Sequence, residues 1–392
     1  MTKKEKIKVN IDINRLGIVD KLDEVNSLVY KILNLDDVDL NDWTHIPFIN
    51  DMKLNKEDPF YHPEGNTLAH TSMVMDEVMK LFKGKEINRK EAEILRLAAF
   101  FHDVGKPEVS IESDNRVRSS GHDLVSFQKA KYILDRLYVD FEVKIKVLSI
   151  IRNHLAPGAF VKQEVGFRAY ERLSWKVDTR LLYLFATCDY KGREKDVIEA
   201  LKQLENFKTD CIKWFVWGKT YKRNKFYNPL KAYLLIGCSG SGKSTYANIL
   251  EEKGAVVISS DDIRKELCGN EEDQSKNKEV FDLIHKRIRY YGDNRVKKIV
   301  IDSTNYSKRN QILTILRSSG YNVEIIYFDI PYFKCIERNN KRERVVPESV
   351  IKRQYEQLIY PNYSEADVIK VVFEHCIKKF PHVAAFKLRK YN

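Results

Sequence analysis

The sequence GCSGSGKST, residues 237–245, most constrains how this chain of 392 residues can fold. It satisfies the pattern G-x-x-x-x-G-K-[ST], follows the apolar run AYLLI and precedes the amphipathic segment YANILEEK. This context predicts a buried strand, a loop whose backbone N–H groups point inward, and a helix whose N-terminus faces the same anion. The residues that we expect to bind a nucleotide's phosphates are Gly237, Ser239, Gly240, Ser241, Gly242, Lys243, Ser244 and Thr245.

Two side chains of this loop have separate expected tasks. Lys243 can reach the β- and γ-phosphates, and Ser244 can ligate magnesium. A chance glycine-rich turn is the structural alternative. The strand before the loop and the helix after it argue against that alternative.

More apolar runs follow the loop and alternate with longer amphipathic segments. Strands that alternate with helices indicate an α/β domain with a parallel sheet, which we place at residues 231–392. The runs are AVVIS at 255–259, KKIVIDS at 297–303, NVEIIYFD at 322–329 and ADVIKVVF at 366–373.

Carboxylates stand at the ends of two of these predicted strands. Asp261 and Asp262 follow AVVIS, and Asp302 lies at the end of the next run, just before Ser303, with Asn305 three residues after Asp302. A carboxylate at the carboxyl edge of a strand beside the phosphate loop can accept a proton from an attacking hydroxyl. Paired Asp residues before a helix are also typical of a helix N-cap, and for either one alone this alternative stays open.

The segment ERNNKRER, residues 337–344, carries a cluster of basic residues. Arg338 and Arg342 are four residues apart, so we predict that they share one helix face and clamp triphosphate oxygens as a lid closes. A solvated basic face is the alternative.

The first half of the chain has a different pattern. From about residue 66 to 215 apolar residues recur at spacings of three and four, as in AEILRLAAFFHDV and FEVKIKVLSIIRNHL, which predicts an all-helical domain. We place this domain at residues 1–218, with its core at about 60–195. The basic stretch 219–230 has no acidic residue, so we predict a linker there; a solvated loop is an equal alternative.

Metal-ligand side chains recur through this helical half at intervals of 20 to 35 residues, so each should come from a different helix or helix end. A His–Asp pair at the last turn of a helix can face one ion, and imidazole with carboxylate suits a divalent metal. A hydrogen-bonded core role is the alternative for any single histidine. The predicted ligands are His70, His102, Asp103, His122, His154 and Asp189.

The charge and composition of the chain limit the functions that it can have. The 68 basic and 56 acidic residues give a formal charge of +12, which favours a polyanionic partner. No run approaches the ~18 apolar residues of a membrane helix, and the N-terminus lacks a secretory pattern, so we expect a cytoplasmic protein without a membrane partner. Six cysteines without a C-x-x-C pair argue against a zinc ribbon and a disulfide framework.

The C-terminal motifs together resemble the phage-type polynucleotide 5′-kinase family over most of residues 231–360. The matching pieces are GCSGSGKST, DDIR, DSTN and the RNNKR segment followed by VP. The resemblance implies that Asp261 is the general base for a 5′-hydroxyl and that Arg264 holds the acceptor phosphate. It also implies that Arg338 and Arg342 contact the donor.

The pattern H…HD…H…H…D resembles the HD phosphohydrolase superfamily across about residues 60–195. YHPEGNTLAHT and HDVGKP are most similar to the HD modules of bacterial CCA-adding enzymes, a likeness that includes His62. This resemblance implies Lys106 near the scissile phosphate. It also implies two ligand sets, with His70, His102, Asp103 and Asp189 around one metal and His122 and His154 for a second.

An HD module followed by such a kinase resembles the HD-domain polynucleotide kinases. That likeness implies ATP-dependent phosphorylation of 5′-hydroxyl ends and metal-dependent removal of 2′,3′-cyclic phosphate, 2′-phosphate or 3′-phosphate ends. The implied cofactors are ATP or another nucleoside triphosphate, Mg²⁺ at the kinase site, and one or two ions such as Mn, Ni, Co or Fe at the HD site. The implied partners are nucleic-acid ends, above all RNA, and a separate ligase.

Three other functions stay open at this point. The first is a small-molecule or toxin-type kinase fused to an HD nucleotide phosphohydrolase, which leaves the +12 charge unexplained. The second is RNA binding without catalysis, against which the intact Lys243, His102 and Asp103 argue. The third is a nucleotide phosphohydrolase in which the glycine loop only senses ATP.

Overall fold

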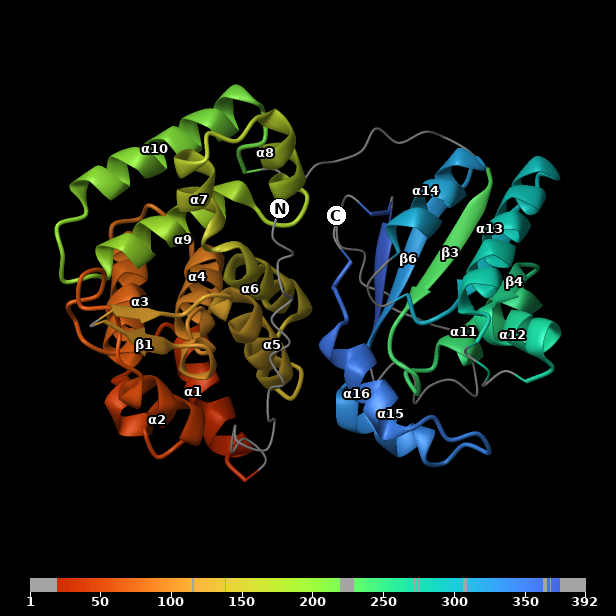
Figure 1. Cartoon of the computed structure of the whole chain (residues 1–392), viewed down its shortest axis with the longest axis horizontal. Helices are drawn as coiled ribbons and strands as arrows, with labels where there is room; N and C mark the ends of the chain where they lie inside the picture. The colour runs from red at the N-terminus through yellow and green to blue at the C-terminus, as the bar shows by residue number, and fades with distance from the viewer. Residues whose placement is uncertain are drawn as a thin grey trace. The chain divides into compact units, whose positions relative to one another are not determined.

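The computed structural model divides the chain into two compact units, Met1–Tyr221 and Lys222–Asn392 (Figure 1). The predicted linker at 219–230 lies outside the described residues except for its last two, so its extent stays a prediction. No helix in the described part of the chain is long and apolar enough to cross a bilayer. The structure describes residues 20–114, 116–137, 139–218, 229–270, 273, 275–305, 309–361, 365–366 and 368–373.

The N-terminal unit is helical, as the apolar spacing predicts. Two short 3₁₀ turns, η2 (Leu40–Trp43) and η3 (Lys106–Glu108), accompany its helices. The helices are α1 (Leu22–Asn34), α2 (Pro47–Leu54), α3 (Thr67–Lys83), α4 (Arg89–Phe101), α5 (His122–Leu134), α6 (Phe141–Asn153), α7 (Ala156–Lys162), α8 (Phe167–Ser174), α9 (Thr179–Lys191) and α10 (Ile198–Lys213).

Helix α4 forms the centre of this unit. A capping box begins it, because the Asn88 side chain accepts from the Glu91 N–H and the Glu91 carboxylate accepts from the Asn88 N–H. Every residue from Ile94 to Phe101 is buried, and the helix packs against α1, α3, α6 and α9. A helix that is buried on all sides holds its C-terminal end in a fixed position. The His102–Asp103 pair follows directly at that end.

A short hairpin corrects the prediction of a purely helical stretch. Strands β1 (Ile111–Ser113) and β2 (Arg116–Arg118) pair antiparallel, with Ile111 opposite Arg118. The turn between them passes through Asp114 at φ 52°, a left-handed conformation that Asp tolerates better than most residues. The segment has no apolar residues at helical spacing, so nothing there favours a helix.

The C-terminal unit has the predicted parallel sheet, in the order β4-β5-β3-β6-β7. All four neighbouring pairs are parallel. The elements are β3 (Lys231–Ile236), α11 (Lys243–Glu252), β4 (Val256–Ser259), α12 (Ser260–Cys268), α13 (Asn277–Asp293), β5 (Lys298–Asp302), α14 (Asn310–Ser318), β6 (Asn322–Asp329), α15 (Tyr332–Asn339), α16 (Glu348–Glu356) and β7 (Val368–Phe373).

This topology gathers the polar strand ends at one place. β3 lies between β5 and β6, although those strands follow it in the chain, so the sheet order reverses beside the loop after β3. Parallel sheets bind ligands beyond the carboxyl ends of their strands at such a reversal. Ser259 is paired with Asp302 in the β4–β5 register, which brings the Asp261 and Asp302 segments to that edge.

Candidate functional site

Six imidazole and carboxylate side chains converge inside the N-terminal unit. They come from five places in the fold, and all are buried. His70 lies in the first turn of α3, His102 and Asp103 follow α4, His122 begins α5, His154 follows α6, and Asp189 lies in the last turn of α9.

Four of these side chains form one group. His70 Nε2 lies 3.0 Å from Asp189 Oδ1 and 3.8 Å from Asp103 Oδ2. His102 Nε2 lies 3.0 Å from Asp103 Oδ2 and 4.0 Å from Asp189 Oδ1. The four donor atoms therefore surround one point, as expected of ligands to a shared cation.

The second group uses the other oxygen of the same aspartate. His122 Nε2 lies 3.2 Å from Asp103 Oδ1 and 3.1 Å from His154 Nε2. Asp103 thus faces one group with Oδ2 and the other with Oδ1. A carboxylate in this position can bridge two metal ions.

Backbone carbonyls fix the orientation of three of the rings. The Nδ1–H groups of His102, His122 and His154 each donate over 2.7 Å to the carbonyl three residues earlier, at Ala99, Ser119 and Ile151. A carbonyl oxygen can only accept, so each Nδ1 carries the hydrogen. The Nε2 lone pairs are then directed into the cluster, which is how proteins orient metal-ligating histidines.

The protonation states of His154 and Asp103 also suit a cation. Burial, together with the charges of His122 and His102, lowers the pKa of His154 to about 4. Burial alone would raise the pKa of Asp103, but the charges of His102 and Lys106 hold it well below its usual range. At neutral pH the carboxylate is ionised and His154 is neutral, the forms in which these side chains bind metals.

The donor set fits a divalent metal centre. Among the described residues, His102 Nε2 and Asp103 Oδ1 are buried polar atoms without a hydrogen-bond partner. Such atoms are costly unless an ion or water satisfies them. The donor atoms of His70, His102 and Asp103 lie within 4.8 Å of one another, as do those of Asp103, His122 and His154. The geometry therefore offers two adjacent cation positions.

Lys106 lies at the edge of the cluster. Its Nζ donates over 2.8 Å to Asp103 Oδ2 and over 2.8 Å to Glu57 Oε1. Burial opposes its charge, but Asp103 and Glu57 outweigh burial and raise the pKa of Lys106. Lys106 is therefore a fixed positive charge beside the cluster. Sequence reasoning missed Glu57, which lies outside every motif.

Two further charged residues that the sequence did not reveal surround the first group. Glu64 Oε1 lies 2.9 Å from His70 Nδ1 and 2.8 Å from His62 Nδ1, which gives His62 a place beside the cluster. Burial opposes a charged His70, but hydrogen bonds with Asp189 and Glu64 raise its pKa to about 9. Arg193 Nη2 lies 3.4 Å from Asp189 Oδ1. Glu64 lies in the YHPEG segment, the one signal that pointed toward it.

In the C-terminal unit the glycine loop adopts a conformation that needs its glycines. Gly240 and Gly242 have φ of 83° and 97°. A Cβ on Gly240 would lie 2.3 Å from the Cys335 carbonyl oxygen, and one on Gly237 would lie 2.7 Å from Ser241 Oγ. A side chain at Gly240 would clash with this backbone carbonyl, and one at Gly237 would press against Ser241 and Phe328. The predicted Ser239 is also held in place, since its N–H donates over 2.8 Å to Gln354 Oε1 on α16.

The side chains around the loop suit a nucleotide with its magnesium ion. Lys243 begins α11 and donates over 2.8 Å to the Cys238 carbonyl, so its ammonium lies against the loop. The Ser244 hydroxyl hydrogen-bonds Asp302, whose pKa is raised by burial. A loop Ser with an Asp from a neighbouring strand is the pair that holds Mg²⁺ in such sites. Ser241 Oγ is buried and has no hydrogen-bond partner within the described part of the chain, as a phosphate-facing donor would be.

Asp261 lies at the same sheet edge, held by two arginines. Arg264 Nη1 lies 2.7 Å from Asp261 Oδ1, and Arg344 Nη1 lies 3.3 Å from Oδ2. Half of the Asp261 side chain is exposed, at 52%, so a substrate can reach it. Asp261 and Asp262 both lie in the first turn of α12, and the Asp262 N–H donates over 3.2 Å to the Ser259 side chain, which caps the helix. Sequence reasoning missed Arg344 as a partner of Asp261.

The two predicted clamp arginines do not share a helix face. α15 ends at Asn339, so Arg338 lies in its last turn and Arg342 lies in the turn beyond. The prediction of a single helix was wrong because the Asn339 side chain bonds the Val346 backbone in both directions, at 2.8 and 3.0 Å, and closes the segment into a loop. The pKa of Lys243 is lowered, mainly by burial and to a smaller extent by the charge of Arg342, while neighbouring groups oppose the shift. Arg342 therefore still lies close to Lys243.

Two families match the chain. The HD domain family matches residues 67–171, and the AAA domain family AAA_33 matches residues 233–360. The first stretch contains five of the six clustered ligands, and Asp189 lies beyond it. The second contains the glycine loop and the basic segment 337–344, which we call the lid segment. The chain is thus one of the proteins that join an HD domain to a kinase-like P-loop domain, as predicted from its sequence.

Three curated relatives share parts of this arrangement. The chain is 28% identical to the "Putative bifunctional polynucleotide kinase/RNA ligase" of Autographa californica nuclear polyhedrosis virus over 54% of this chain and 33% of that protein. It is 25% identical to the multifunctional CCA protein of Mannheimia succiniciproducens over 34% of this chain and 32% of that protein. It is 30% identical to the UPF0200 protein of Sulfurisphaera tokodaii over 142 residues, 33% of this chain and 78% of that protein. This third of the chain belongs to the UPF0200 protein's family.

The chain spans about one third of the length of the first two relatives. Among solved structures, it is similar to a chain of the Pnkp1/Rnl/Hen1 RNA repair complex, with 20% identity and a TM-score of 0.31. That match covers 35% of this chain and 47% of the other. A gluconokinase from Sinorhizobium meliloti matches 37% of this chain and 85% of its own, with 20% identity and a TM-score of 0.28.

Proposed function

We propose that the chain repairs both ends of a broken nucleic-acid strand, preferably RNA. In this proposal the C-terminal unit phosphorylates a 5′-hydroxyl from ATP. The N-terminal unit removes a 2′,3′-cyclic phosphate, a 2′-phosphate or a 3′-phosphate. The observation that carries the proposal is that one chain holds two separate groups of residues suited to phosphate chemistry. One is the His–Asp cluster with its two ligand groups. The other is the glycine loop with its strand-end carboxylates.

The N-terminal chemistry depends on the cluster. His70, His102, Asp103 and Asp189 would hold one divalent ion, and His122 and His154 would share Asp103 with a second. Ions there would supply hydroxide near neutral pH and neutralise phosphate charge. Lys106 is held 2.8 Å from Asp103, where its ammonium can bind a non-bridging oxygen of the phosphate under attack.

In the C-terminal unit, we assign each step of phosphate transfer to residues near the carboxyl edge of the sheet. Lys243 and the loop amides bind the phosphates, and Ser244 with Asp302 hold Mg²⁺. Asp261 accepts the proton of the attacking hydroxyl, while Arg264 binds the acceptor phosphate. Arg338 and Arg342 act on the donor.

The substrate class is supported by charge and by the names of relatives. A net charge of +12 suits a polyanion. One relative is named for polynucleotide kinase and RNA ligase activities, and one related structure is an RNA repair complex. Because one relative is named for kinase and ligase activities together, we propose that a separate ligase seals the ends that this chain repairs.

Transfer of label from γ-labelled ATP to a 5′-hydroxyl oligonucleotide tests the kinase half. We expect labelling by the natural chain and a loss of at least a hundredfold with Lys243→Ala, because the β- and γ-phosphates lose their cation. Glu343→Ala, at an exposed acid of the lid segment, is the control variant and should keep full activity. Absence of transfer to any polynucleotide, with transfer to a small alcohol instead, would establish the small-molecule kinase alternative.

An oligonucleotide with a 2′,3′-cyclic phosphate end tests the other half. Incubation with Mn²⁺ should release a 3′-end without phosphate, and a chelator should stop the reaction. Hydrolysis of free nucleotides alone, with intact polynucleotide ends, would instead support a nucleotide phosphohydrolase.

A further inference from the structure

An exposed pair of aromatic rings lies next to the metal cluster. Phe60 is 60% exposed and Tyr61 is 48% exposed, and their ring centroids are 4.9 Å apart with an interplanar angle of 87°. Side chains of this size are normally buried, so two adjacent exposed rings indicate a binding surface. Tyr61 is followed at once by His62, whose ring centroid lies 4.6 Å from that of His70 in the cluster.

Two cations complete this surface, which we call the aromatic platform: Phe60, Tyr61, Arg116 and Lys195. Arg116 Cζ lies 5.4 Å from both ring centroids. Lys195 Nζ lies 3.9 Å from the Phe60 centroid and 5.4 Å from that of Tyr61. Rings interleaved with cations are typical of surfaces that bind single-stranded nucleic acid, because the rings stack on bases and the cations attract the backbone.

The platform is held in shape before any ligand arrives. The buried Asp58 carboxylate accepts from Phe60 N–H at 3.0 Å and from Arg116 Nε at 2.7 Å. Lys195 Nζ donates over 2.9 Å to the Phe60 carbonyl. Rings that are already ordered lose little conformational entropy when they bind, so they can contribute most of the stacking energy.

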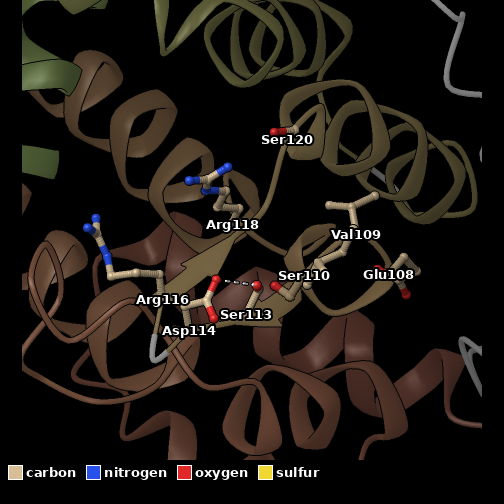
Figure 2. Close-up of a pocket in the computed structure, with 9 residues that line it drawn as sticks. Glu108, Val109, Ser110, Ser113, Asp114, Arg116, Arg118 and Ser120 are labelled. Carbon is tan, nitrogen blue, oxygen red and sulfur yellow. Dashed lines mark hydrogen bonds between the residues drawn. The ribbon is translucent and has the colours of Figure 1, made fainter.

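The platform adjoins a pocket of about 620 Å³ beside the β1–β2 hairpin. Arg116 belongs to both, and Ser110, Arg118 and Ser120 also line the pocket. Figure 2 shows Arg116 and Arg118 extending to the same side of strand β2, as alternate strand residues do. The pocket also reaches Glu108, the last residue of the η3 turn that begins with Lys106. Platform and pocket are therefore linked to the cluster by two short chain segments.

We infer that Phe60 and Tyr61 stack on the base of the terminal nucleotide whose phosphate lies at the metal cluster. Arg116 and Arg118 then bind the next phosphodiester of the strand. This inference rests on the proposed 3′-end activity and adds to it: the N-terminal unit selects ends that carry a base over bare phosphate esters.

Binding can be tested without any hydrolysis. The full chain is titrated into a single-stranded RNA that ends in 2-aminopurine riboside with a free 3′-hydroxyl, the product of the proposed reaction. Stacking should quench the probe's fluorescence. Phe60→Ala/Tyr61→Ala should abolish the quenching and weaken binding roughly tenfold. Tyr61→Phe should keep both, and so should Tyr30→Ala, at a more exposed tyrosine of α1.

Kinetics then separate this inference from the proposed function. For a 3′-phosphate end that carries its base, the double variant should raise KM about tenfold with little change in kcat, while an abasic end should show no change in KM. Equal effects on both ends, or unchanged quenching, would overturn the role of the platform. Hydrolysis of neither end by the natural chain would overturn the proposed activity itself, whatever the quenching shows.

Discussion

The Nε2 atoms of His122 and His154 lie 3.1 Å apart, and the Nδ1–H of each ring is already committed to a backbone carbonyl. In the neutral rings two lone pairs would therefore face each other. A cation or a shared proton between them removes that repulsion. This relationship is the clearest sign that the second histidine pair is built around a ligand and not around its own hydrogen bonds.

Metal should stabilise the chain through this pair. Mn²⁺ at about 100 times its dissociation constant should raise the free energy of unfolding of the N-terminal unit by about 2.7 kcal/mol for each site. Thermal unfolding in Mn²⁺ and in chelator measures this difference. His122→Ala should lose part of the response and bind fewer ions per chain. His45→Ala, at an exposed histidine of the same unit, should keep all of it.

Without metal, stability should peak near pH 6.5. The pKa of His154 is lowered to about 4, so between pH 6.5 and 4 the unfolded chain takes up a proton that the folded chain does not, and stability falls as pH falls. The pKa of His70 is raised to about 9, so its contribution is full below pH 6.5 and is lost as pH rises to 9. Across each of these two pH ranges, the free energy of unfolding should change by roughly 3 kcal/mol.

Urea denaturation of the chelated protein across pH 4 to 9 measures this curve. His154→Gln cannot titrate, so it should flatten the acid side and leave the alkaline side. Saturating Mn²⁺ should reduce the alkaline slope and steepen the acid slope, because metal binding keeps the histidines of the folded chain unprotonated. A stability that rises steadily from pH 4 to 9 would contradict the assigned protonation states.

The two activities should be separable by single substitutions. Asp103→Ala removes the carboxylate that faces both ligand groups, so it should abolish 3′-end hydrolysis and leave 5′ phosphorylation near its natural rate. Asp261→Ala removes the proposed general base and should lower phosphorylation by about 10²- to 10⁴-fold while hydrolysis continues. Assays of 3′-end hydrolysis and 5′ phosphorylation on both variants test this prediction. Equal loss of both activities in either variant would contradict independent sites.

Glu57 should act by holding Lys106. Glu57→Gln leaves a hydrogen bond to Lys106 but removes a charge that raises its pKa, so the alkaline limb of the hydrolysis pH profile should move to lower pH. We expect a larger loss of kcat at pH 9 than at pH 7. Glu112→Gln, on the exposed strand β1, is the control. A uniform loss at all pH values would indicate a structural role only.

Gly105 should tolerate no side chain. A Cβ there would lie 2.4 Å from the Ser126 backbone nitrogen on α5, so Gly105→Ala should destabilise the unit by about 1–3 kcal/mol. Gly166→Ala is a matched control, because nothing lies within 4 Å of its Cβ position. Chemical denaturation compares the two variants. Equal stabilities would show that α5 can move away from the His102–Asp103 turn at little cost.

Local patterns in the sequence were sufficient to predict much of the fold and of the candidate sites. The strand, loop and helix around 237–245 are specified by contiguous residues, since glycines and a buried apolar run leave few other conformations. The apolar spacing before His102 likewise predicts a buried helix that ends at a His–Asp pair. Both of these features depend on neighbours within about ten residues, which a sequence displays directly.

The features that the sequence did not predict depend on packing between residues that are far apart in the chain. Glu57 and Arg193 join the cluster through contacts that no motif records, and the Asn339 loop separates Arg338 from Arg342 although their spacing fits a helix. The requirement for Gly105 comes from the approach of α5, since its own φ of −95° suits any residue. The sequence determines which side chains can bind phosphate or metal. Only the packing of distant helices determines which of them meet, because burial and charge act through space and not along the chain.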